Sequence, residues 1–195
     1  MKHLRANVLL LGLTLVICSV LYPAVLLGIA QGVFPDTASG SLIAGPGGSF
    51  VGSRLIAQEF KGDGWFQPRP SAADYNAAAA GASNLGASNP KLRERVVKQL
   101  GSRNDPIPAD AVTTSGGGLD PHITLRNARD QLPRVAAVRA AGLGKGESEV
   151  RMAIDAMLSA AAFTPLGGLA GGELLVNVLE VNLAVSEQFP ASTTK

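Results

Sequence analysis

The chain has 195 residues, among them 17 Lys or Arg, 15 Asp or Glu and one Cys. Lys2 and Arg5 supply the whole excess of positive charge, because the other 15 basic residues and all 15 acidic residues follow residue 30. A surface of balanced charge has no surplus for phosphates, which excludes a nucleic-acid-binding domain, and the lone Cys18 excludes an intrachain disulfide.

Residues 8–30 form an uncharged, mostly apolar stretch. As a helix this stretch spans about 35 Å at about 1.5 Å per residue, enough to cross a hydrocarbon core of about 30 Å. Positive side chains tend to stay on the cytoplasmic side of a membrane, and after Arg5 the next basic residue is Arg54. We therefore expect a cytoplasmic N-terminus over residues 1–7, a transmembrane helix over 8–30 and an exported domain over 31–195.

Two other fates of the apolar stretch are open. Gly28-Ile29-Ala30 resembles the cleavage site of a signal peptide, and Cys18 would be the acylated residue of a lipoprotein. A signal peptide has a shorter apolar region, of about 7–15 residues, and a lipoprotein needs a small residue where Ile17 stands. An uncleaved anchor is the favoured interpretation.

Pro23 lies in the second half of the stretch, where its missing N–H is expected to kink the helix. Small residues of the kind that allow close helix packing in a membrane lie along the same stretch: Gly12, Ser19, Ala24 and Gly28. These features favour a helix that packs against other membrane helices.

Turn residues divide the exported region into short elements. Residues 41–43 and 50–60 are expected to pair as strands around the turn at 45–48. Residues 68–89 show no periodic pattern and are expected to be irregular. A long irregular segment in a small domain is typical of a binding surface.

Two pairs, Asn89-Pro90 and Asp120-Pro121, place a capping side chain before a proline, as at the start of many helices. We expect helices over residues 91–100 and 121–131, with a loop between them. Pro133 should end or kink the second of these helices.

The C-terminal third contributes the remaining elements. Residues 134–141 are expected to continue as helix, and apolar residues at helical spacing predict an amphipathic helix over 147–162. Alternation of apolar and polar residues predicts a long strand over 174–185. The chain is therefore expected to be α+β, with one transmembrane helix and a single exported domain that has strands at both ends and helices between.

Motifs for catalysis and metal binding are incomplete. His122 has no second histidine or cysteine in the exported region with which to hold zinc. Residues 142–146 lack the Ser or Thr that follows the lysine of a phosphate-binding loop. Ser83 lacks the second glycine of a serine-nucleophile elbow, because Leu85 stands there. The sequence predicts no catalytic residue, no metal site and no cofactor of its own.

Six sequence blocks follow one another behind the apolar stretch. They are GSRLIAQEF (52–60), RPSA (69–72), SNLGASNP (83–90), GLDPHIT (118–124), RVAAVR (134–139) and VNVLEVNLAV (176–185). In this order and spacing they resemble the C subunit of the Kdp potassium-transporting ATPase, over nearly the whole chain. The sequence departs from the family at Gln67-Pro68, where His-Gly is usual, and this departure concerns the local loop shape.

The resemblance implies an accessory, non-enzymatic subunit of a complex that imports K⁺ with high affinity across the bacterial inner membrane at the expense of ATP. The implied partners are a channel-like A subunit, a P-type ATPase B subunit and a small F peptide. The family is described as a catalytic chaperone that raises the ATP affinity of the B subunit. ATP is therefore implied only indirectly, through that partner.

The glycine-rich segment 115–119 is likened in this family to a nucleotide-binding signature. The orientation expected from Lys2 and Arg5 places this segment outside, where ATP is absent. We expect a flexible loop here, although its position before a capped helix would also suit an anion.

Residues expected at a partner interface lie in or beside these blocks. They are Arg69, Ser83, Asn84, Leu85, Leu119, Asp120, His122 and Arg134. The alternative is a membrane-anchored periplasmic enzyme or binding protein that acts alone, and the incomplete motifs count against it.

Overall fold

The computed structural model of the chain describes residues 2–45, 48–101, 103, 106–169 and 171–190. It divides into two compact units, residues 1–53 and 54–195, which we describe separately as the N-terminal and C-terminal units. The expected turn at 45–48 lies partly outside the described residues.

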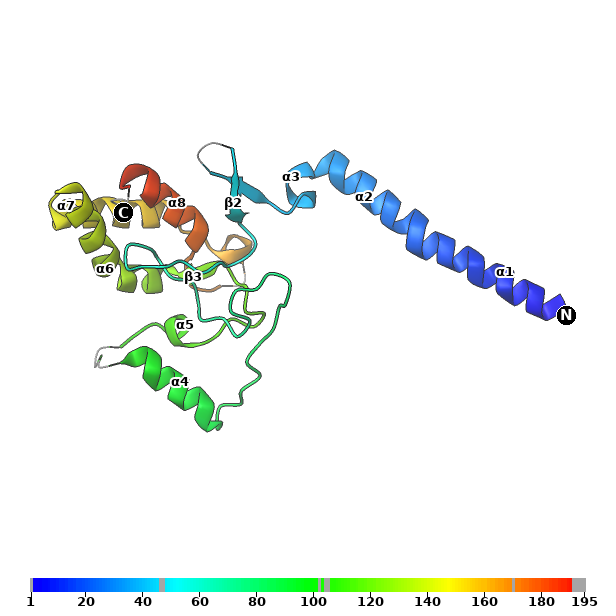
Figure 1. The fold of residues 1–195 in the computed structure, drawn as a ribbon, viewed down its shortest axis with the longest axis horizontal. Helices are drawn as coiled ribbons and strands as arrows, with labels where there is room; N and C mark the ends of the chain where they lie inside the picture. The colour runs from blue at the N-terminus through cyan, green and yellow to red at the C-terminus, as the bar shows by residue number, and fades with distance from the viewer. Residues whose placement is uncertain (1, 46–47, 102, 104–105, 170, 191–195) are drawn as a thin grey trace. The chain divides into compact units, whose positions relative to one another are not determined.

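A continuous helical segment opens the N-terminal unit (Figure 1). It consists of α1 (Lys2–Val16), a π-helical turn (Ile17–Leu21) and α2 (Tyr22–Val33). The 31 residues His3–Val33 are apolar and long enough to cross a membrane, and their side chains are not buried against the protein. The apolar helix predicted from the sequence is confirmed, and it is longer than residues 8–30.

The π-helical turn accommodates Pro23. Proline has no N–H to donate to the carbonyl four residues earlier, and its ring presses against that carbonyl. Directly before Pro23, the N–H of Tyr22 donates to the carbonyl of Ile17, five residues back instead of four. The wider turn is a usual response of a helix to such a misfit, and it stands where we expected a kink.

A short helix and a hairpin complete the N-terminal unit. After α3 (Pro35–Ala38), β1 (Leu42–Ala44) pairs antiparallel with β2 (Phe50–Ser53). The Ser53 hydroxyl donates to the carbonyl of Gly40 at 2.7 Å and closes the base of the hairpin. The predicted hairpin is confirmed, but the prediction that its second strand continues to residue 60 is wrong, because the chain turns after Ser53.

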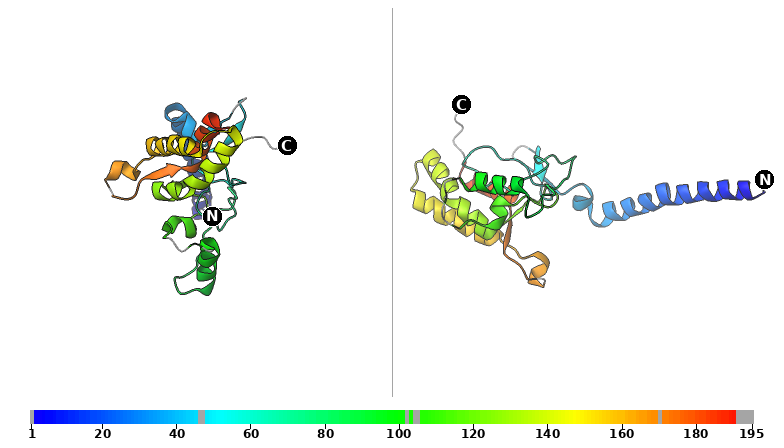
Figure 2. Two further views of the ribbon diagram at one scale, coloured as in Figure 1. Left: turned by 90° about the vertical axis from the view of Figure 1, so that its left-hand side faces the viewer. Right: turned by 90° about the horizontal axis from the view of Figure 1, so that it is seen from below.

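The C-terminal unit has its apolar core between three helices, α6 (Leu125–Leu143), α7 (Glu147–Ala161) and α8 (Val178–Gln188). Figures 1 and 2 show α6 and α7 side by side. Apolar side chains at helical spacing fill the core, including Val135, Val150, Ile154, Leu158, Val181 and Val185. The helix predicted over 147–162 is confirmed.

A small antiparallel sheet pairs β3 (His122–Thr124) with β4 (Leu175–Asn177), and His122 lies opposite Asn177. The two strands of this sheet directly precede α6 and α8. The α+β class is therefore confirmed, but the strands form two separate two-stranded sheets and the second lies among the helices.

The prediction of a helix start at Pro121 is wrong. The Asp120 carboxylate accepts the N–H of His122 at 3.0 Å, which closes a turn and leads into β3. The hydroxyl of Thr124 accepts the N–H of Asn127 at 3.0 Å and caps α6. Pro133 lies inside α6, which continues to Leu143, so the proline does not end the helix.

The prediction of a long strand over 174–185 is also wrong. The side chain of Asn177 accepts the N–H groups of Leu179 and Glu180, at 3.1 and 3.2 Å, and so starts α8 after a strand of three residues. The buried residues Val178, Val181 and Val185 recur at a helical period, not an alternating one.

One further helix lies between the irregular segments. Helix α4 (Pro90–Leu100) begins as predicted, with the Asn89 side chain accepting the N–H of Lys91 at 3.0 Å. The expected loop after it contains the single-turn helix α5 (Ala109–Val112). The residues from 68 to 89 form neither helix nor strand, as predicted.

Candidate functional site

Two irregular segments of the C-terminal unit, residues 69–86 and 113–122, lie against each other and form what we call the loop cluster. Backbone hydrogen bonds join them: the N–H of Ser115 donates to Pro70 at 3.2 Å, and that of Gly81 donates to Gly117 at 2.9 Å. The N–H of Ala57 donates to the carbonyl of Leu119 at 2.9 Å. The expectation of a free loop at 115–119 therefore gives way to a segment tied on two sides, with Ser115 buried.

Arg69 links the two segments through its guanidinium group. It donates to the carbonyl of Thr114 at 3.2 Å and to the hydroxyl of Thr113 at 3.4 Å, and one nitrogen lies 3.5 Å from the Asp120 carboxylate. The side chain is 25% exposed, so the pair with Asp120 is only partly shielded from solvent. The Arg69 Nε atom is buried and has no hydrogen-bond partner among the described residues.

Ser71 organises the turn that follows Arg69. Its hydroxyl donates to the carbonyl of Gly118 at 2.6 Å and accepts the N–H groups of Ala73 and Tyr75, at 3.1 and 3.0 Å. The Tyr75 hydroxyl donates back to the carbonyl of Arg69 at 2.9 Å. Burial, followed by the negative charges of Glu59 and Asp74, raises the pKa of Tyr75, so its phenol stays protonated and keeps donating.

Gly118 sits where no other residue fits. Its φ of +72° lies in the left-handed region, and a Cβ atom built there would approach the Gly81 carbonyl oxygen to 2.7 Å. The close approach brings the two loop segments into contact. A glycine is therefore required here by both conformation and space.

Asp120 and His122 form a second polar pair at the edge of the loop cluster. The Asp120 carboxylate accepts from the His122 backbone N–H and lies 3.2 Å from its Nδ1 atom. Burial raises the pKa of Asp120, but the hydrogen bonds from His122 and the charges of His122 and Arg69 outweigh burial and lower it overall. The His122 ring also packs edge-on against Phe163, with ring centroids 5.3 Å apart.

The loop cluster gathers most, but not all, of the residues expected at an interface. Ser83 contributes its hydroxyl, 3.2 Å from that of Thr114, while Leu119 contributes the carbonyl that Ala57 binds. Asn84 follows with an exposed side chain and a positive φ of 50°, and Leu85 is partly exposed.

Arg134 lies elsewhere, on α6. It donates to the backbone carbonyls of Asp63 and Trp65 and to the side chain of Gln131. Burial lowers the pKa of Arg134 and the nearby charge of Asp63 opposes that shift. Arg134 therefore holds the 63–67 segment and is not part of the loop cluster.

Arg139, one α6 turn further along, binds the same segment from inside the core. It is 1% exposed, donates to the carbonyls of Gly64 and Phe189 at 2.9 Å each, and its guanidinium lies 4.4 Å from the ring centre of Trp65. Trp65 in turn stacks on Phe60 at 5.8 Å. Removal from solvent lowers the pKa of Arg139.

Sequence reasoning missed several polar residues of the loop cluster, namely Ser71, Tyr75, Thr113 and Thr114. Thr113 and Thr114 could have been proposed from the sequence, because they directly precede the glycine-rich segment. The bonds of Ser71 and Tyr75 could not be predicted, since their partners are 47 and six residues away and both are backbone carbonyls.

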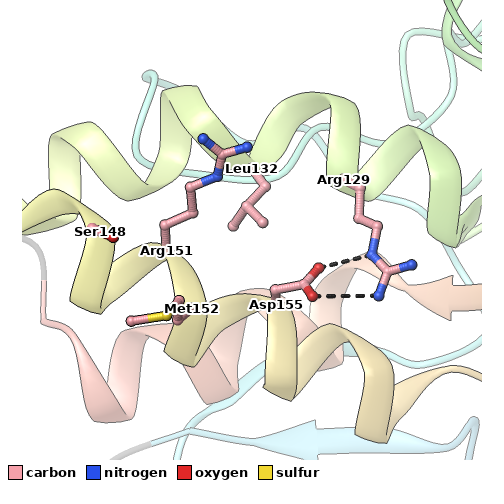
Figure 3. Close-up of a pocket in the computed structure, with 6 residues that line it drawn as sticks. All are labelled: Arg129, Leu132, Ser148, Arg151, Met152 and Asp155. Atoms are coloured by element: carbon pink, nitrogen blue, oxygen red, sulfur yellow. Dashed lines mark hydrogen bonds and ion pairs between the residues drawn. The ribbon is translucent and has the colours of Figure 1, made fainter.

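Two pockets lie beside the loop cluster and the core. One, of about 370 Å³, is lined by polar residues of α4, α6 and the 67–75 segment, with Arg103 bonded to Asp130 at 2.7 Å. The other, of about 480 Å³, lies along α6 and α7, where Figure 3 shows Arg129 and Asp155 joined across the two helices. Within the described part of the chain, no three or more His, Cys, Asp and Glu side chains gather in a way that would hold a metal ion.

The segment 142–146, which superficially resembles a phosphate-binding loop, contains the end of α6 and the connection of residues 144–146 between α6 and α7. Gly144 ends α6 in the left-handed conformation, with φ +63° and ψ 25°. Its N–H donates back to the helix, as in a common helix end, and the adjacent Lys145 lies 5.7 Å from the Phe189 ring.

Together, the apolar helix and the α+β unit define a class of protein, a small domain attached to one helix able to cross a membrane. A model of the KdpC family, described as the K⁺-transporting ATPase c chain, matches residues 4–187. The chain therefore belongs to the KdpC family, as its sequence blocks had suggested.

Relatives in several bacteria match nearly the whole chain. The potassium-transporting ATPase KdpC subunit of Pseudomonas entomophila is 44% identical over 192 residues and covers 96% of each chain. The subunit of the same name in Cereibacter sphaeroides is 47% identical and covers 95% of this chain and 97% of its own. The Geobacter sulfurreducens subunit is 42% identical and covers 97% of this chain and 100% of its own.

Proposed function

We propose that this chain is an accessory, non-catalytic subunit of a complex that imports K⁺ at the expense of ATP. The observation that carries the proposal is the family match over residues 4–187, together with relatives that are named as subunits of a potassium-transporting ATPase. The incomplete catalytic motifs of the sequence support the accessory role.

The chain is anchored in the bacterial inner membrane by its apolar helix, with residues 1–7 in the cytoplasm and residues 31–195 outside. Lys2 and Arg5 support this orientation because they precede the helix and its other flank has no basic residue before Arg54. The length and composition of His3–Val33 support a single membrane crossing.

The partners in this proposal are a channel-like A subunit, a P-type B subunit and a small F peptide. The loop cluster is the surface through which the exported domain contacts a partner, over the outer mouth of the A subunit. Its polar bonds support this assignment, because they fix an irregular surface in one shape and leave Asn84, Gly116 and Gly117 exposed. A raised ATP affinity of the B subunit then passes through the assembly, without nucleotide bound to this chain.

Deletion of the chain tests the accessory role. We expect cells that depend on this transporter to stop growing at low external K⁺, and the remaining subunits to separate during purification. ATPase activity of the assembled complex should resist substitution of any polar residue in this chain that leaves assembly intact. Full K⁺ uptake and an intact complex without the chain would contradict the proposal.

A matched pair of substitutions tests the interface. Ala82→Arg introduces a long charged side chain on the exposed edge of the loop cluster, and Ala184→Arg introduces the same side chain on the exposed face of α8. We expect only Ala82→Arg to reduce recovery of the partner subunits with the tagged chain. Equal recovery with both variants would place the interface elsewhere.

A C-terminal reporter fusion tests the orientation. We expect alkaline phosphatase fused after residue 195 to be active, because it matures only outside the cytoplasm, and a cytoplasmic reporter at the same position to be silent. The reverse pattern would contradict the exported placement.

A further inference from the structure

A short loop between α7 and β4 carries the most exposed apolar side chains of the C-terminal unit. This leucine loop, residues 163–174 except the undescribed 170, appears in orange in Figure 2 and extends away from the helices. Leu166 is 75% exposed and Leu169 is 95% exposed, with Phe163 and Leu174 at 41% and 43% at its base. Single exposed leucines scattered over a surface are ordinary, but two largely exposed leucines close together on one short loop are unusual.

The base of the leucine loop is held firmly while its tip has no packing partner in the described structure. Phe163 and Leu175 exchange backbone hydrogen bonds at 2.9 and 2.8 Å, and the Phe163 ring packs against His122. Leu166 adopts a left-handed backbone, with φ 53°, beside Gly167 and Gly168. The strained residue turns the tip outward, away from the core.

Part of the backbone of the leucine loop is hydrogen-bonded within the loop itself. The N–H groups of Gly167, Leu169 and Gly171 each donate to the carbonyl three residues earlier, at 3.2, 3.3 and 3.0 Å. Backbone groups without partners are costly to remove from water, so these successive turns lower the cost of moving the tip into an apolar phase. No charged residue lies between Asp155 and Glu173 in the sequence, so the tip carries no charge either.

A basic side chain stands at the base of the leucine loop. Arg126 and Arg129 line a surface hollow with Leu174 and Glu173. Arg129 is paired with Asp155 at 2.7 Å, whereas Arg126 is exposed and has no ion pair among the described residues, so Arg126 is available to an anionic headgroup. An apolar tip above a basic base is typical of segments that enter the interfacial region of a bilayer.

We propose that the leucine loop inserts Leu166 and Leu169 into the lipid surface of the membrane that the apolar helix spans. This inference rests on the proposed function, because it needs the C-terminal unit to lie on a membrane surface. The two units belong to one chain, so the apolar helix keeps the C-terminal unit tethered to the bilayer. Tethering raises the effective concentration of the loop at the lipid surface, so a weak apolar contact is enough.

A single-cysteine probe in the full-length chain tests the insertion. On a Cys18→Ser background, Leu169→Cys is labelled with an environment-sensitive nitrobenzoxadiazole dye and reconstituted in vesicles of neutral and anionic phospholipid. We expect blue-shifted emission and quenching by lipids spin-labelled about 5–10 Å below the headgroup, more strongly in anionic vesicles. Met152→Cys on α7 is the matched control, also exposed at 66%, and it should keep the emission of a dye in water.

Two results would overturn the insertion. One is water-like emission at residue 169 in both kinds of vesicle. The other is a blue shift that needs the remaining subunits and is insensitive to spin-labelled lipid, which would show that the leucine loop docks on a protein. Labelling of Met152→Cys by a membrane-impermeant reagent in intact cells reports on export separately, so a failure of the proposed orientation is distinguishable from a failure of insertion.

Discussion

The helical core and the loop cluster of the C-terminal unit are stabilised by different forces. Val135, Ile154 and Val185 in the core have no exposed surface, so burial of apolar area holds α6, α7 and α8 together. Among the described residues from 54 to 120, the buried apolar side chains are few, namely Ala57, Phe66, Pro68 and Pro108. The loop cluster depends instead on directed hydrogen bonds from a few side chains.

This difference has a consequence for tolerance to mutation. Apolar packing is non-directional and accepts substitutions of similar volume, whereas a hydrogen bond to a backbone carbonyl requires one donor in one place. In the core we therefore expect the loss of stability to grow with the volume that a substitution removes. In the loop cluster we expect it to depend on which residue is replaced. Trp65 is the only tryptophan of the chain, and its fluorescence follows unfolding of the detergent-solubilised protein in the experiments below.

The largest loss of stability is expected from a substitution in the helical core. Ile154→Ala removes a fully buried side chain and should lower the free energy of unfolding by about 2–5 kcal/mol, measured by denaturant titration. Met152→Ala, on the same helix but 66% exposed, should change it by less than about 0.5 kcal/mol. Equal effects would mean that α7 does not bury the face described above.

The next largest loss of stability is expected where α8 holds the segment that leads into the loop cluster. Asn182 of α8 accepts the N–H of Phe66 and donates to its carbonyl, both at 2.9 Å, and all these groups are buried. Asn182→Ala leaves both backbone groups without a partner and should lower the free energy of unfolding by about 3 kcal/mol. Asn182→Asp keeps an acceptor for the N–H but faces the carbonyl with a carboxylate, so it should not restore stability. A stable Asn182→Ala variant would show that this buried contact between α8 and Phe66 does not contribute to stability.

A pair of glycine substitutions separates space from conformation. Gly118→Ala places a methyl group 2.7 Å from the Gly81 carbonyl oxygen, at φ +72°, and should cost about 2 kcal/mol or more. Gly144→Ala has a similar φ of +63° but open space around it, and should cost about 1 kcal/mol. If both substitutions lower the stability equally in thermal unfolding, the close approach of Gly118 to Gly81 does not contribute to the stability of the fold.

The smallest expected effect is on how the free energy of unfolding depends on pH. The pKa of Asp120 in the folded chain lies below its ordinary value of 3.8, so its contribution is present above that value and is lost as the pH falls through the folded pKa. The contribution should be at most about 1 kcal/mol, because the carboxylate is 38% exposed. Asp120→Asn should flatten this acidic part of the stability profile, and an unchanged profile would argue against the Asp120–His122 pair.

Local signals in the sequence predicted elements whose start and packing are set within a few residues. Asn89 caps α4 as expected, and the apolar spacing of 147–162 matches α7. The error over 174–185 arose because Asn177 ends one strand and caps one helix in a single position. Short alternation and helical spacing are hard to separate over so few residues, and tertiary burial of Val178, Val181 and Val185 decides between them.

The candidate site was harder to predict because long-range contacts make it. Arg69 and Asp120 stand 51 residues apart, and their approach depends on the turn at Ser71 and on Gly118. Arg134 belonged to a recognisable block, but nothing in its neighbours showed that it would bind backbone carbonyls at Asp63 and Trp65. The sequence blocks thus identified residues that lie near one another in the fold, but not the bonds between them.

The π-helical turn at Ile17–Leu21 bears on how the chain length can vary. An α-turn takes about 3.6 residues and a π-turn about one more, so this turn holds a residue in excess of the regular helix. Loss of one residue here would restore a regular α-helix, whereas a deletion elsewhere in α1 or α2 would rotate every side chain beyond it by about 100°. The turn is therefore the place where the apolar helix can gain or lose a residue in evolution while each half keeps the face it presents to its surroundings.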